Sequence, residues 1–378
     1  MSKVLFKNCK ITAIKTVVPN DYIDIDDEIK YFENSEKKLN RAKKIIGYGR
    51  RHIVDKNTTS LDLSYEAAES LLTELDINRE EIDTLLFVSQ TRDYLLPTSA
   101  NVLHGLLNLS ENCAAMDVSQ GCSGYVYALC FAHSLIQSGV SKKLLLLSSD
   151  TISKYSNQDN RLTAPIFGDS ASATLLEYTE KECNAYFVLG SKGKGFDKII
   201  IPAGGSRIPV TSDIVDKVVV DENNNHWKNQ DIIMSGVDVF NFTMDYAPKS
   251  INEVLEFSNY SKEDIGMYAL HQANKQIVES VAIKAEIPLE KTPTNTFSDY
   301  GNNACNSIAV NLTQNINGLG RGNALLCGFG VGLSWASSII NIDGTKNLGI
   351  SLYKDTKNTK TVEELKEYWY NRFITKGE

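Results

Sequence analysis

The stretch that decides the fold reads Ala114-Ala-Met-Asp-Val-Ser-Gln-Gly-Cys122-Ser-Gly-Tyr-Val-Tyr-Ala-Leu-Cys-Phe-Ala-His-Ser-Leu-Ile136. Residues Ala114–Val118 form a short apolar run of the kind that makes buried strands. A turn of small residues around Cys122 follows, and the apolar run behind it predicts a helix over Cys122–Gln137. A buried strand that leads directly into a helix is a building unit of α/β proteins.

The same alternation continues on both sides of this stretch. Apolar runs at Thr84–Ser89 and Leu144–Ser148 predict further buried strands. A helix is predicted before them at Ser60–Leu75 and another between them at Ser99–Leu107. Strands separated by helices are typical of a mostly parallel sheet that is covered on both faces. A second series of the same kind begins after Asp169, so we expect two α/β halves of similar size.

Three segments divide the chain. We expect an N-terminal half over residues 1–182, a C-terminal half over residues 183–342 and an extension over residues 343–378. Residues 204–231 are rich in Asn, Asp and Lys without periodicity, which predicts an exposed excursion from the second half. The extension is expected to be a polar linker followed by an amphipathic helix.

Composition excludes several classes of protein. With 378 residues, 42% hydrophobic and 23% charged, the chain is expected to be soluble and globular. A net charge of −8 argues against nucleic-acid binding, and seven scattered cysteines indicate neither a disulfide framework nor a zinc site. The N-terminus lacks the apolar run of a signal peptide, and glycines interrupt the uncharged run Asn323–Asn341. We therefore expect a cytoplasmic protein without membrane insertion.

Three residues at turns into helices are candidates for chemistry. Cys122 stands at a predicted helix start, where backbone N–H groups favour a thiolate nucleophile. His271 ends the predicted strand Met267–His271, at the sheet edge where α/β proteins place their sites. Asn302 follows Gly301 in a turn before a further helix. Each has an ordinary alternative, namely a buried structural cysteine, a hydrogen-bonded histidine and a helix-capping asparagine.

Taken together, these residues resemble the three active-site motifs of the 3-oxoacyl-acyl-carrier-protein synthase III family of the thiolase superfamily. The resemblance extends over residues 9–342 and rests on motifs in the family's order: Cys122 after its Asp-Val strand, His271-Gln-Ala-Asn274, Gly301-Asn302, Phe167–Ala173 and Gly328–Trp335. It implies a five-layered αβαβα thiolase fold with two pseudo-symmetric halves. It also implies a homodimer that needs no metal and no redox cofactor.

The resemblance further implies a decarboxylative Claisen condensation. Cys122 would take an acyl group from a thioester, and a malonyl thioester would then lose carbon dioxide and attack the acyl group. His271 and the Asn302 amide would donate hydrogen bonds to the thioester oxygen, on which enolate charge develops. The backbone N–H groups of Cys122 and Val331 would bind the oxyanion of acyl transfer, although the family usually has glycine at the second position.

The chain departs from the family pattern at residues that are expected to bind the acyl donor. Members that take acyl-coenzyme A carry a Trp and an Arg where this chain has Arg41 and Ile45, although Arg161 matches the other wall of the adenine site. An acyl-carrier protein, or an unusual thioester, is therefore the expected donor. Carrier proteins are acidic, so Lys275 and Lys284 are candidate docking residues, with ordinary solvated lysines as the alternative.

Further residues are expected to contact the substrate. Asp93–Thr98 resembles the loop that crosses the family's dimer interface and closes the partner's acyl pocket, with Leu96 at the position that limits chain length. Asn274 and Phe329 belong to the matched motifs and are expected to bind substrate.

The sequence bears on four alternative functions. A thiolase needs a second cysteine, but Cys327 falls one residue early in the motif. Hydroxymethylglutaryl-coenzyme A synthases need a Glu where this chain has Gln90. An acyltransferase that passes the acyl group of Cys122 to a hydroxyl or amine stays open. A non-catalytic carrier-binding subunit also stays open, although the intact Cys–His–Asn set argues against it.

Overall fold

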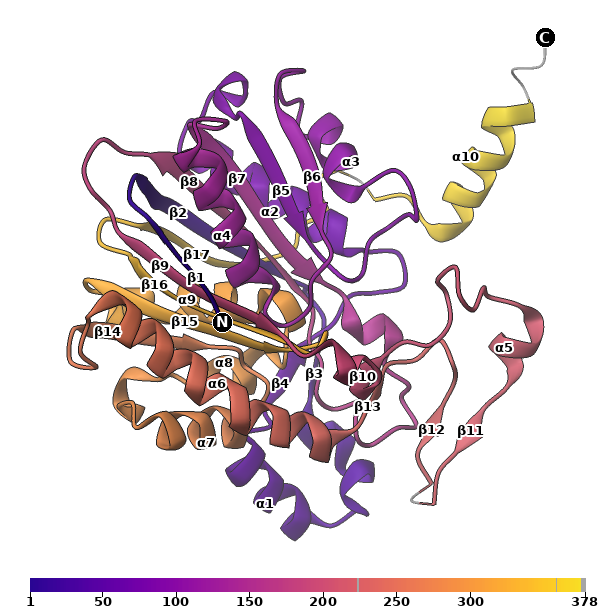
Figure 1. Cartoon of the computed structure of the whole chain (residues 1–378). Helices are drawn as coiled ribbons and strands as arrows, with labels where there is room; N and C mark the ends of the chain where they lie inside the picture. Colours follow the sequence, from indigo (N-terminus) through magenta and orange to yellow (C-terminus); the bar gives the residue numbers. More distant parts are fainter. Residues whose placement is uncertain (223, 358, 375–378) are drawn as a thin grey trace.

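The computed structural model describes residues 1–222, 224–357 and 359–374. Figure 1 shows two sheets separated by helices and covered by helices on their outer faces. One sheet has six strands in the order β17-β2-β8-β7-β5-β6, and the other has five in the order β1-β9-β16-β15-β14. The predicted five-layered αβαβα arrangement is therefore confirmed.

The six-stranded sheet belongs mainly to the N-terminal half. Its inner strand β5 pairs in parallel with both β6 and β7, whereas β8 runs antiparallel to β7 and β2. Side chains of α2 and α3 pack on the outer face, in a core that includes Leu71, Phe87 and Leu103. The elements are β2 (Cys9–Val18), α2 (Ser60–Glu74), β5 (Thr84–Val88), α3 (Ser99–Leu106), β6 (Ala114–Val118), β7 (Lys143–Asp150) and β8 (Ser170–Tyr178).

Two helices form the middle layer. Helices α4 (Gly124–Gln137) and α9 (Ser307–Leu319) contribute Tyr125 and Ile308 to an apolar core that both sheets line. The Tyr125 hydroxyl lies 2.9 Å from Thr174 Oγ1, so the one polar atom of this buried ring has a partner. Both helices begin close to the residues that the sequence selects as catalytic.

The five-stranded sheet belongs mainly to the C-terminal half, and α6 and α7 cover its outer face. Its elements are β9 (Ala185–Ser191), α6 (Gly236–Ser258), β14 (Ile265–Leu270), α7 (Lys275–Ala285), β15 (Asn323–Gly330) and β16 (Ser334–Asn341). The smaller elements are β3 (Tyr22–Asp24), α1 (Glu36–Ile46), β4 (Arg50–His52), β10 (Ile199–Ile200), α5 (Ser212–Asp216), β11 (Val219–Val220), β12 (His226–Trp227), β13 (Ile233–Met234) and α8 (Asn295–Tyr300).

Each end of the chain adds a strand to the sheet that belongs mainly to the other half. Strand β1 (Ser2–Phe6) pairs antiparallel with β9 in the sheet of the C-terminal half, and β17 (Lys346–Leu352) pairs in parallel with β2 in the other sheet. The expected polar linker is therefore wrong over Lys346–Leu352, where Asn and Gly interrupt the apolar pattern that would have indicated a strand. The domain boundaries at residues 182 and 342 stay predictions.

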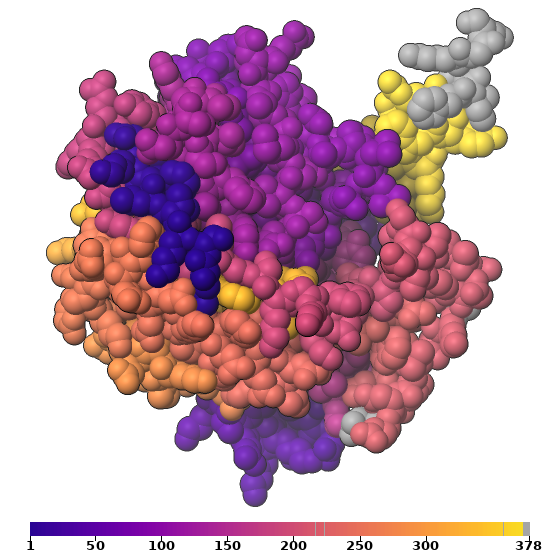
Figure 2. Space-filling view, in the orientation of Figure 1, coloured from indigo at the N-terminus to yellow at the C-terminus, as the bar shows by residue number. Residues whose placement is uncertain are grey.

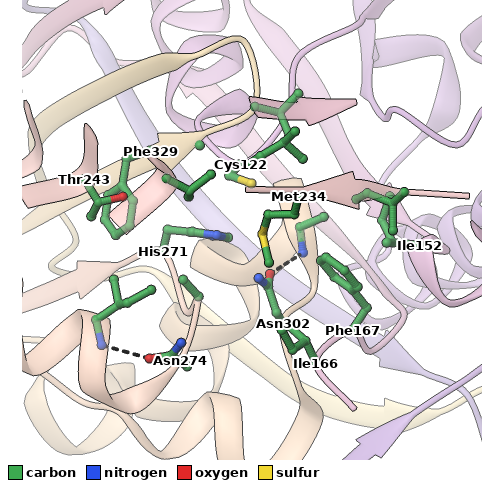
Figure 3. A pocket seen from close by; sticks show the side chains of 18 of the residues that line it. Cys122, Ile152, Ile166, Phe167, Met234, Thr243, His271, Asn274, Asn302 and Phe329 are labelled. Atoms are coloured by element: carbon green, nitrogen blue, oxygen red, sulfur yellow. Dashed lines mark hydrogen bonds between the residues drawn. The ribbon is translucent and has the colours of Figure 1, made fainter. Parts of the chain in front are cut away.

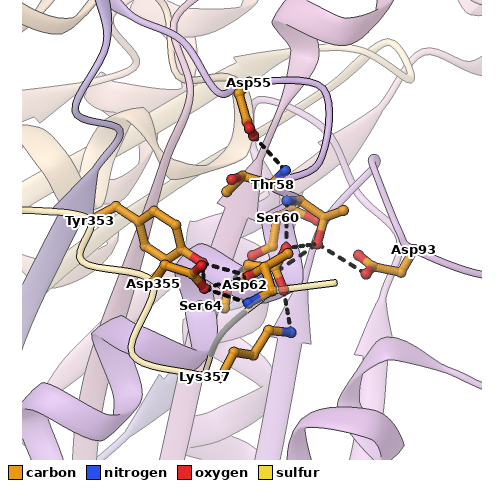
Figure 4. A network of polar contacts seen from close by, with 11 residues as sticks. Asp55, Thr58, Ser60, Asp62, Ser64, Asp93, Tyr353, Asp355 and Lys357 are labelled. Atoms are coloured by element: carbon orange, nitrogen blue, oxygen red, sulfur yellow. Dashed lines mark hydrogen bonds and ion pairs between the residues drawn. The ribbon is translucent and has the colours of Figure 1, made fainter. Parts of the chain in front are cut away.

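The C-terminal extension is fastened to the N-terminus of α2. Figure 4 shows that Lys357 forms an ion pair with Asp62, in a network that also includes Tyr353 and Asp93. The predicted terminal helix is α10 (Val362–Ile374), which projects from the body in Figure 1. Its Trp369 ring packs edge-on against Tyr94, with 6.2 Å between the ring centroids.

The polar excursion 204–231 is mostly exposed over residues 204–220, as predicted, whereas residues 226–231 are half-buried and Asn225 is buried. It contains α5 and the short pair β11–β12, and Figure 2 shows it as a lobe beside the body of the molecule. In the part of the chain that the structure describes, no helix is both long enough and apolar enough to span a bilayer.

Candidate active site

Two glycines of strand β15 allow the turn that carries Cys122 to lie close to that strand. Cys122 lies in the turn between β6 and α4, and a Cβ atom added to Gly330 of β15 would lie 2.6 Å from its sulfur. A Cβ atom at Gly328 would lie 2.6 Å from Ser123 Cα. These contacts explain why the β15 motif is glycine-rich, because larger residues would displace the turn that carries the thiol.

The thiol is buried, and this corrects one expectation about its ionisation. Helix α4 begins at Gly124, after the cysteine, and Cys122 is only 8% exposed. Burial raises the pKa of the Cys122 thiol to about 11, although the backbone N–H groups of Val331 and Cys122 act to lower that pKa. The predicted helix-start thiolate is thus not present at neutral pH. Both N–H groups nevertheless face the sulfur, as the oxyanion prediction requires.

His271 follows β14 and is neutral at physiological pH. Burial lowers the pKa of its imidazole to about 3. Its Nδ1 lies 2.6 Å from the Ser307 hydroxyl, which also accepts a hydrogen bond from the Gln272 backbone N–H at 3.3 Å. The Phe329 ring packs edge-on against the imidazole, with centroids 5.4 Å apart. Ser307 begins α9 and orients the ring, a role that sequence reasoning missed.

Asn302 is fixed by its own turn and by the Phe167–Ala173 motif. Its Oδ1 accepts a hydrogen bond from the Ala304 N–H at 3.0 Å, which leaves the Nδ2 amide without a hydrogen bond to any described residue. Its backbone bonds Ile166 O at 2.9 Å and Gly168 N at 3.1 Å. A Cβ atom at Gly168 would lie 1.9 Å from Tyr300 O, so the two motifs interlock only with glycine there.

The three predicted catalytic residues line one pocket. Figure 3 shows Cys122, His271 and Asn302 around one cavity. Its other predicted lining residues are Val331, Phe329 and Asn274, and most of the remaining wall is aliphatic. Asn274 also caps α7, because its Oδ1 accepts a hydrogen bond from the Ile277 N–H at 2.8 Å.

The other predicted contact residues lie outside this pocket. Leu96 is 83% exposed, so its predicted role in a partner's pocket stays a prediction. Arg161 lines a separate polar hollow together with Tyr31, an aromatic residue that sequence reasoning missed. Lys275, the first residue of α7, pairs with Glu279 at 3.8 Å, whereas Lys284 is exposed near the other end of that helix. Their docking roles also stay predictions.

The buried carboxylate of Asp150 connects two loops beside the site. Asp150, at the end of β7, accepts hydrogen bonds from the backbone N–H groups of Gln90 at 2.7 Å and Cys305 at 3.2 Å. It also accepts one from Thr91 Oγ1 at 3.1 Å. Burial raises the pKa of this carboxyl, and the donors act against that shift. Asp150 thereby ties the Gln90 loop to the turn that carries Asn302.

Known proteins with similar sequences share one family name. A relative from Campylobacter jejuni, provisionally named 3-oxoacyl-[acyl-carrier-protein] synthase 3, is 39% identical over 356 residues, which cover 94% of this chain and 100% of the relative. The beta-ketoacyl-[acyl-carrier-protein] synthase III of Clostridium perfringens is 33% identical over 341 residues, covering 89% of this chain and 100% of that protein.

Solved structures and family models agree with these relatives. The crystal structure of a 3-oxoacyl-(acyl-carrier protein) synthase from Burkholderia xenovorans superimposes with a TM-score of 0.85 at 33% identity, covering 93% of this chain and 99% of that one. The family model of 3-oxoacyl-[acyl-carrier-protein] synthase III matches residues 116–193, and the model of its C-terminal part matches residues 255–342. The chain therefore belongs to the 3-oxoacyl-[acyl-carrier-protein] synthase III family.

Proposed function

We propose that this protein is a ketosynthase that transfers an acyl group to Cys122 and condenses it with a malonyl thioester. The observation that carries the proposal is the convergence of Cys122, His271 and Asn302 on one largely apolar pocket. The names of the relatives, which are condensing enzymes of this type, support it.

The first step is acyl transfer. The Cys122 sulfur attacks the carbonyl carbon of the donor thioester, and the bond from that carbon to the donor's sulfur breaks. The thiol proton ends on the released donor thiol, so charge is balanced. While the carbonyl oxygen carries negative charge, the backbone N–H groups of Cys122 and Val331, which face the sulfur, stabilise it.

The second step is decarboxylative condensation. The malonyl thioester loses carbon dioxide, and the electron pair left behind forms an enolate on its thioester oxygen. The enolate carbon attacks the acyl–Cys122 carbonyl, and the sulfur leaves and takes up a proton. His271 and Asn302 are suited to binding the enolate oxygen because each uses its other polar atom for a fixed internal contact, with Ser307 and Ala304 respectively.

The contact with Ser307 supports one tautomer of His271. The Gln272 N–H occupies one lone pair of the Ser307 oxygen, which leaves the hydroxyl hydrogen free to be donated to His271 Nδ1. A neutral ring that accepts at Nδ1 carries its proton on Nε2. We infer that Nε2–H is the group that donates to the enolate oxygen.

We further propose a homodimer. Strand β6 is an edge of the six-stranded sheet, and its Met116 is 42% exposed. The adjoining loop exposes Leu95 and Leu96, at 74% and 83%. Soluble monomers seldom leave an unpaired strand beside such apolar side chains, so a second copy of the chain is the partner we propose for this edge.

The proposed donor is an acidic acyl-carrier protein. Helix α1, which contacts α7 near Gly47 and Lys275, is strongly basic in an otherwise acidic chain. Its Arg41 and Lys44 are exposed and form no ion pair with any described residue. Through the contact of α1 with α7, Arg41 and Lys44 add basic charge to the side of the molecule on which α7 begins with Lys275. Coenzyme A is the competing donor, and the hollow of Tyr31 and Arg161 is where its nucleotide would bind.

One experiment separates the proposed function from its rivals. Purified protein is incubated with a panel of acyl thioesters, and the acyl mass is mapped to a peptide. Labelled malonyl thioester is then added, and carbon dioxide and the 3-oxoacyl product are measured. Acylation of Cys122 followed by both products supports the ketosynthase. Acylation without any decarboxylation supports an acyltransferase, and no acylation at all supports a non-catalytic subunit.

A further inference from the structure

The C-terminal extension contacts the loop Asp93–Thr98 through a network of charged groups, which Figure 4 shows. Lys357 of the extension forms an ion pair with Asp62, whose side chain is 4% exposed. The Thr59 hydroxyl lies 3.0 Å from Asp62 Oδ2 and 3.0 Å from Asp93 Oδ2. Because that hydroxyl has a single hydrogen, it can donate to only one of the two carboxylates at a time.

Asp93 is the carboxylate that depends more on a nearby cation. Its Oδ1 atom is buried and forms no hydrogen bond with any described residue. The pKa of Asp93 is raised to about 6, first by burial and then by the charge of Asp62, whereas Lys357 acts to lower it. At neutral pH Asp93 is therefore ionised beside a second carboxylate, and the extension supplies positive charge that favours this arrangement.

A second contact between the extension and the loop is aromatic. The Trp369 ring of α10 packs edge-on against Tyr94, and its indole N–H donates a hydrogen bond to the Tyr94 hydroxyl. Tyr368, which is 41% exposed, packs in turn against the Trp369 ring, with 5.0 Å between the centroids. Tyr94 precedes the two exposed leucines of the loop, so the loop and α10 form one continuous set of apolar and aromatic side chains.

The neighbouring sheet edge indicates what covers these side chains. Asp117 of β6 accepts hydrogen bonds from the backbone N–H groups of Ser99 at 2.9 Å and Ala100 at 2.7 Å, so the helix that follows the loop begins against the edge strand. Figure 1 shows α10 on the same side of the molecule as α3 and β6. An unpaired strand beside apolar side chains suits a second copy of the chain, because a two-fold axis places the same strand, loop and helix opposite.

We propose that the C-terminal extension positions the loop Asp93–Thr98 and forms, together with this loop, part of the surface that binds the second copy. This inference rests on the proposed homodimer. Lys357 and Trp369 are positioning residues, since the first stabilises the place of Asp93 and the second that of Tyr94. Both lie beyond residue 342, where the match to the family model ends, so the family motifs do not mark them.

The test measures the rate at which two differently labelled populations of the protein exchange subunits. Trp369→Ala should speed exchange about two- to tenfold, as expected for the loss of one aromatic pair. Lys357→Met should speed it at least about tenfold, the scale of a hydrogen bond to a charged group, whereas Lys357→Arg keeps the charge and should exchange like the wild type. Lys360→Met is the matched control, because Lys360 is an exposed lysine of the same segment.

A double-variant cycle tests whether Lys357 acts on Asp93. Asp93→Asn removes the charge that Lys357 compensates, so Lys357→Met should have a smaller effect in that background, about threefold or less. An equal effect in both backgrounds means that the lysine does not act on Asp93 and contradicts its positioning role.

Two further outcomes would overturn the inference. If the wild type exchanges subunits and both Lys357→Met and Trp369→Ala exchange at the same rate as it does, the extension does not contribute to the dimer surface. If the wild type is a monomer, the inference and the proposed homodimer are both wrong. Acylation of Cys122 and decarboxylation, measured on the same samples, test the proposed ketosynthase separately.

Discussion

Replacing Asn302 tests whether its amide stabilises the enolate. Asn302→Ala removes the Nδ2 donor that faces the pocket, but it also removes the Oδ1 atom that accepts from the Ala304 N–H at 3.0 Å. Asn302→Asp retains an oxygen for that N–H and loses only the donor. Both variants therefore lack the Nδ2 donor, but only Asn302→Ala also leaves the Ala304 N–H without its hydrogen bond.

The structure sets the size of each effect. Loss of one preorganised donor to a developing oxyanion lowers the rate about 10²- to 10³-fold, so decarboxylation should fall by this factor in Asn302→Ala. In Asn302→Asp it should fall at least as far, because a carboxylate also repels the enolate. Ala304 is 3% exposed, so its unpaired N–H should lower the free energy of unfolding of the Ala variant by about 1–3 kcal/mol. The Asp variant escapes that loss.

The assay measures carbon dioxide release from a malonyl thioester, acylation of Cys122 and denaturant unfolding in parallel. Acylation should stay within about tenfold of wild type in Asn302→Ala, because its oxyanion is bound by other N–H groups. Asn303→Ala is the matched control, since Asn303 is a buried amide of the same turn that bonds Tyr300 O at 3.1 Å without lining the pocket. If Asn303→Ala loses decarboxylation equally, the shape of the turn matters rather than the Nδ2 donor. If Asn302→Ala retains decarboxylation, the Nδ2 donor is not needed.

Three further predictions follow from the site and its surroundings. Gly330→Ala, whose Cβ would lie 2.6 Å from the Cys122 sulfur, should abolish acylation in a protein whose circular dichroism is unchanged. Because burial lowers the pKa of His271 to about 3, the folded state binds its proton only far below pH 6.5. The stability that this shift contributes is therefore present above pH 6.5 and lost as pH falls toward 3, which urea titrations at several pH values measure. Charge reversal at Arg41 and Lys44 should slow acylation from a carrier protein at low salt and leave coenzyme A thioesters less affected, a difference that vanishes if the carrier does not dock on α1.

The sequence was most informative where local patterns and tertiary constraints coincide. Strand β5 agrees with its predicted bounds to within one residue because its apolar run is uninterrupted and buried. Strand β6 has the predicted bounds, but it is an edge strand whose side chains are half-buried or exposed, so the expectation that it is buried is wrong. The motifs around Cys122 and Asn302 are recognisable because their glycines are required by close approach of neighbouring residues, as at Gly121 and Gly301. Their convergence on one pocket could be expected from the family resemblance, but not from spacing alone.

Other features depend on contacts that no local pattern records. Strand β17 exists because β2 offers it a free edge, so its weak apolar pattern did not reveal it. The pKa of the Cys122 thiol depends more on desolvation, which results from packing against strand β15, than on the nearby backbone N–H groups that the sequence indicates.

Burial also explains how one pocket can support two reactions. With a thiol pKa of about 11 and an imidazole pKa of about 3, neither Cys122 nor His271 is charged at neutral pH. In the proposed reactions, negative charge then develops on substrate oxygens, first beside the N–H groups of Cys122 and Val331 and later beside His271 and Asn302. The two side-chain donors are each held at the opposite atom, through Ser307 and Ala304, and need no reorganisation when the charge arrives. The apolar wall therefore raises the thiol pKa and, for the same reason, strengthens every donor aimed into the pocket.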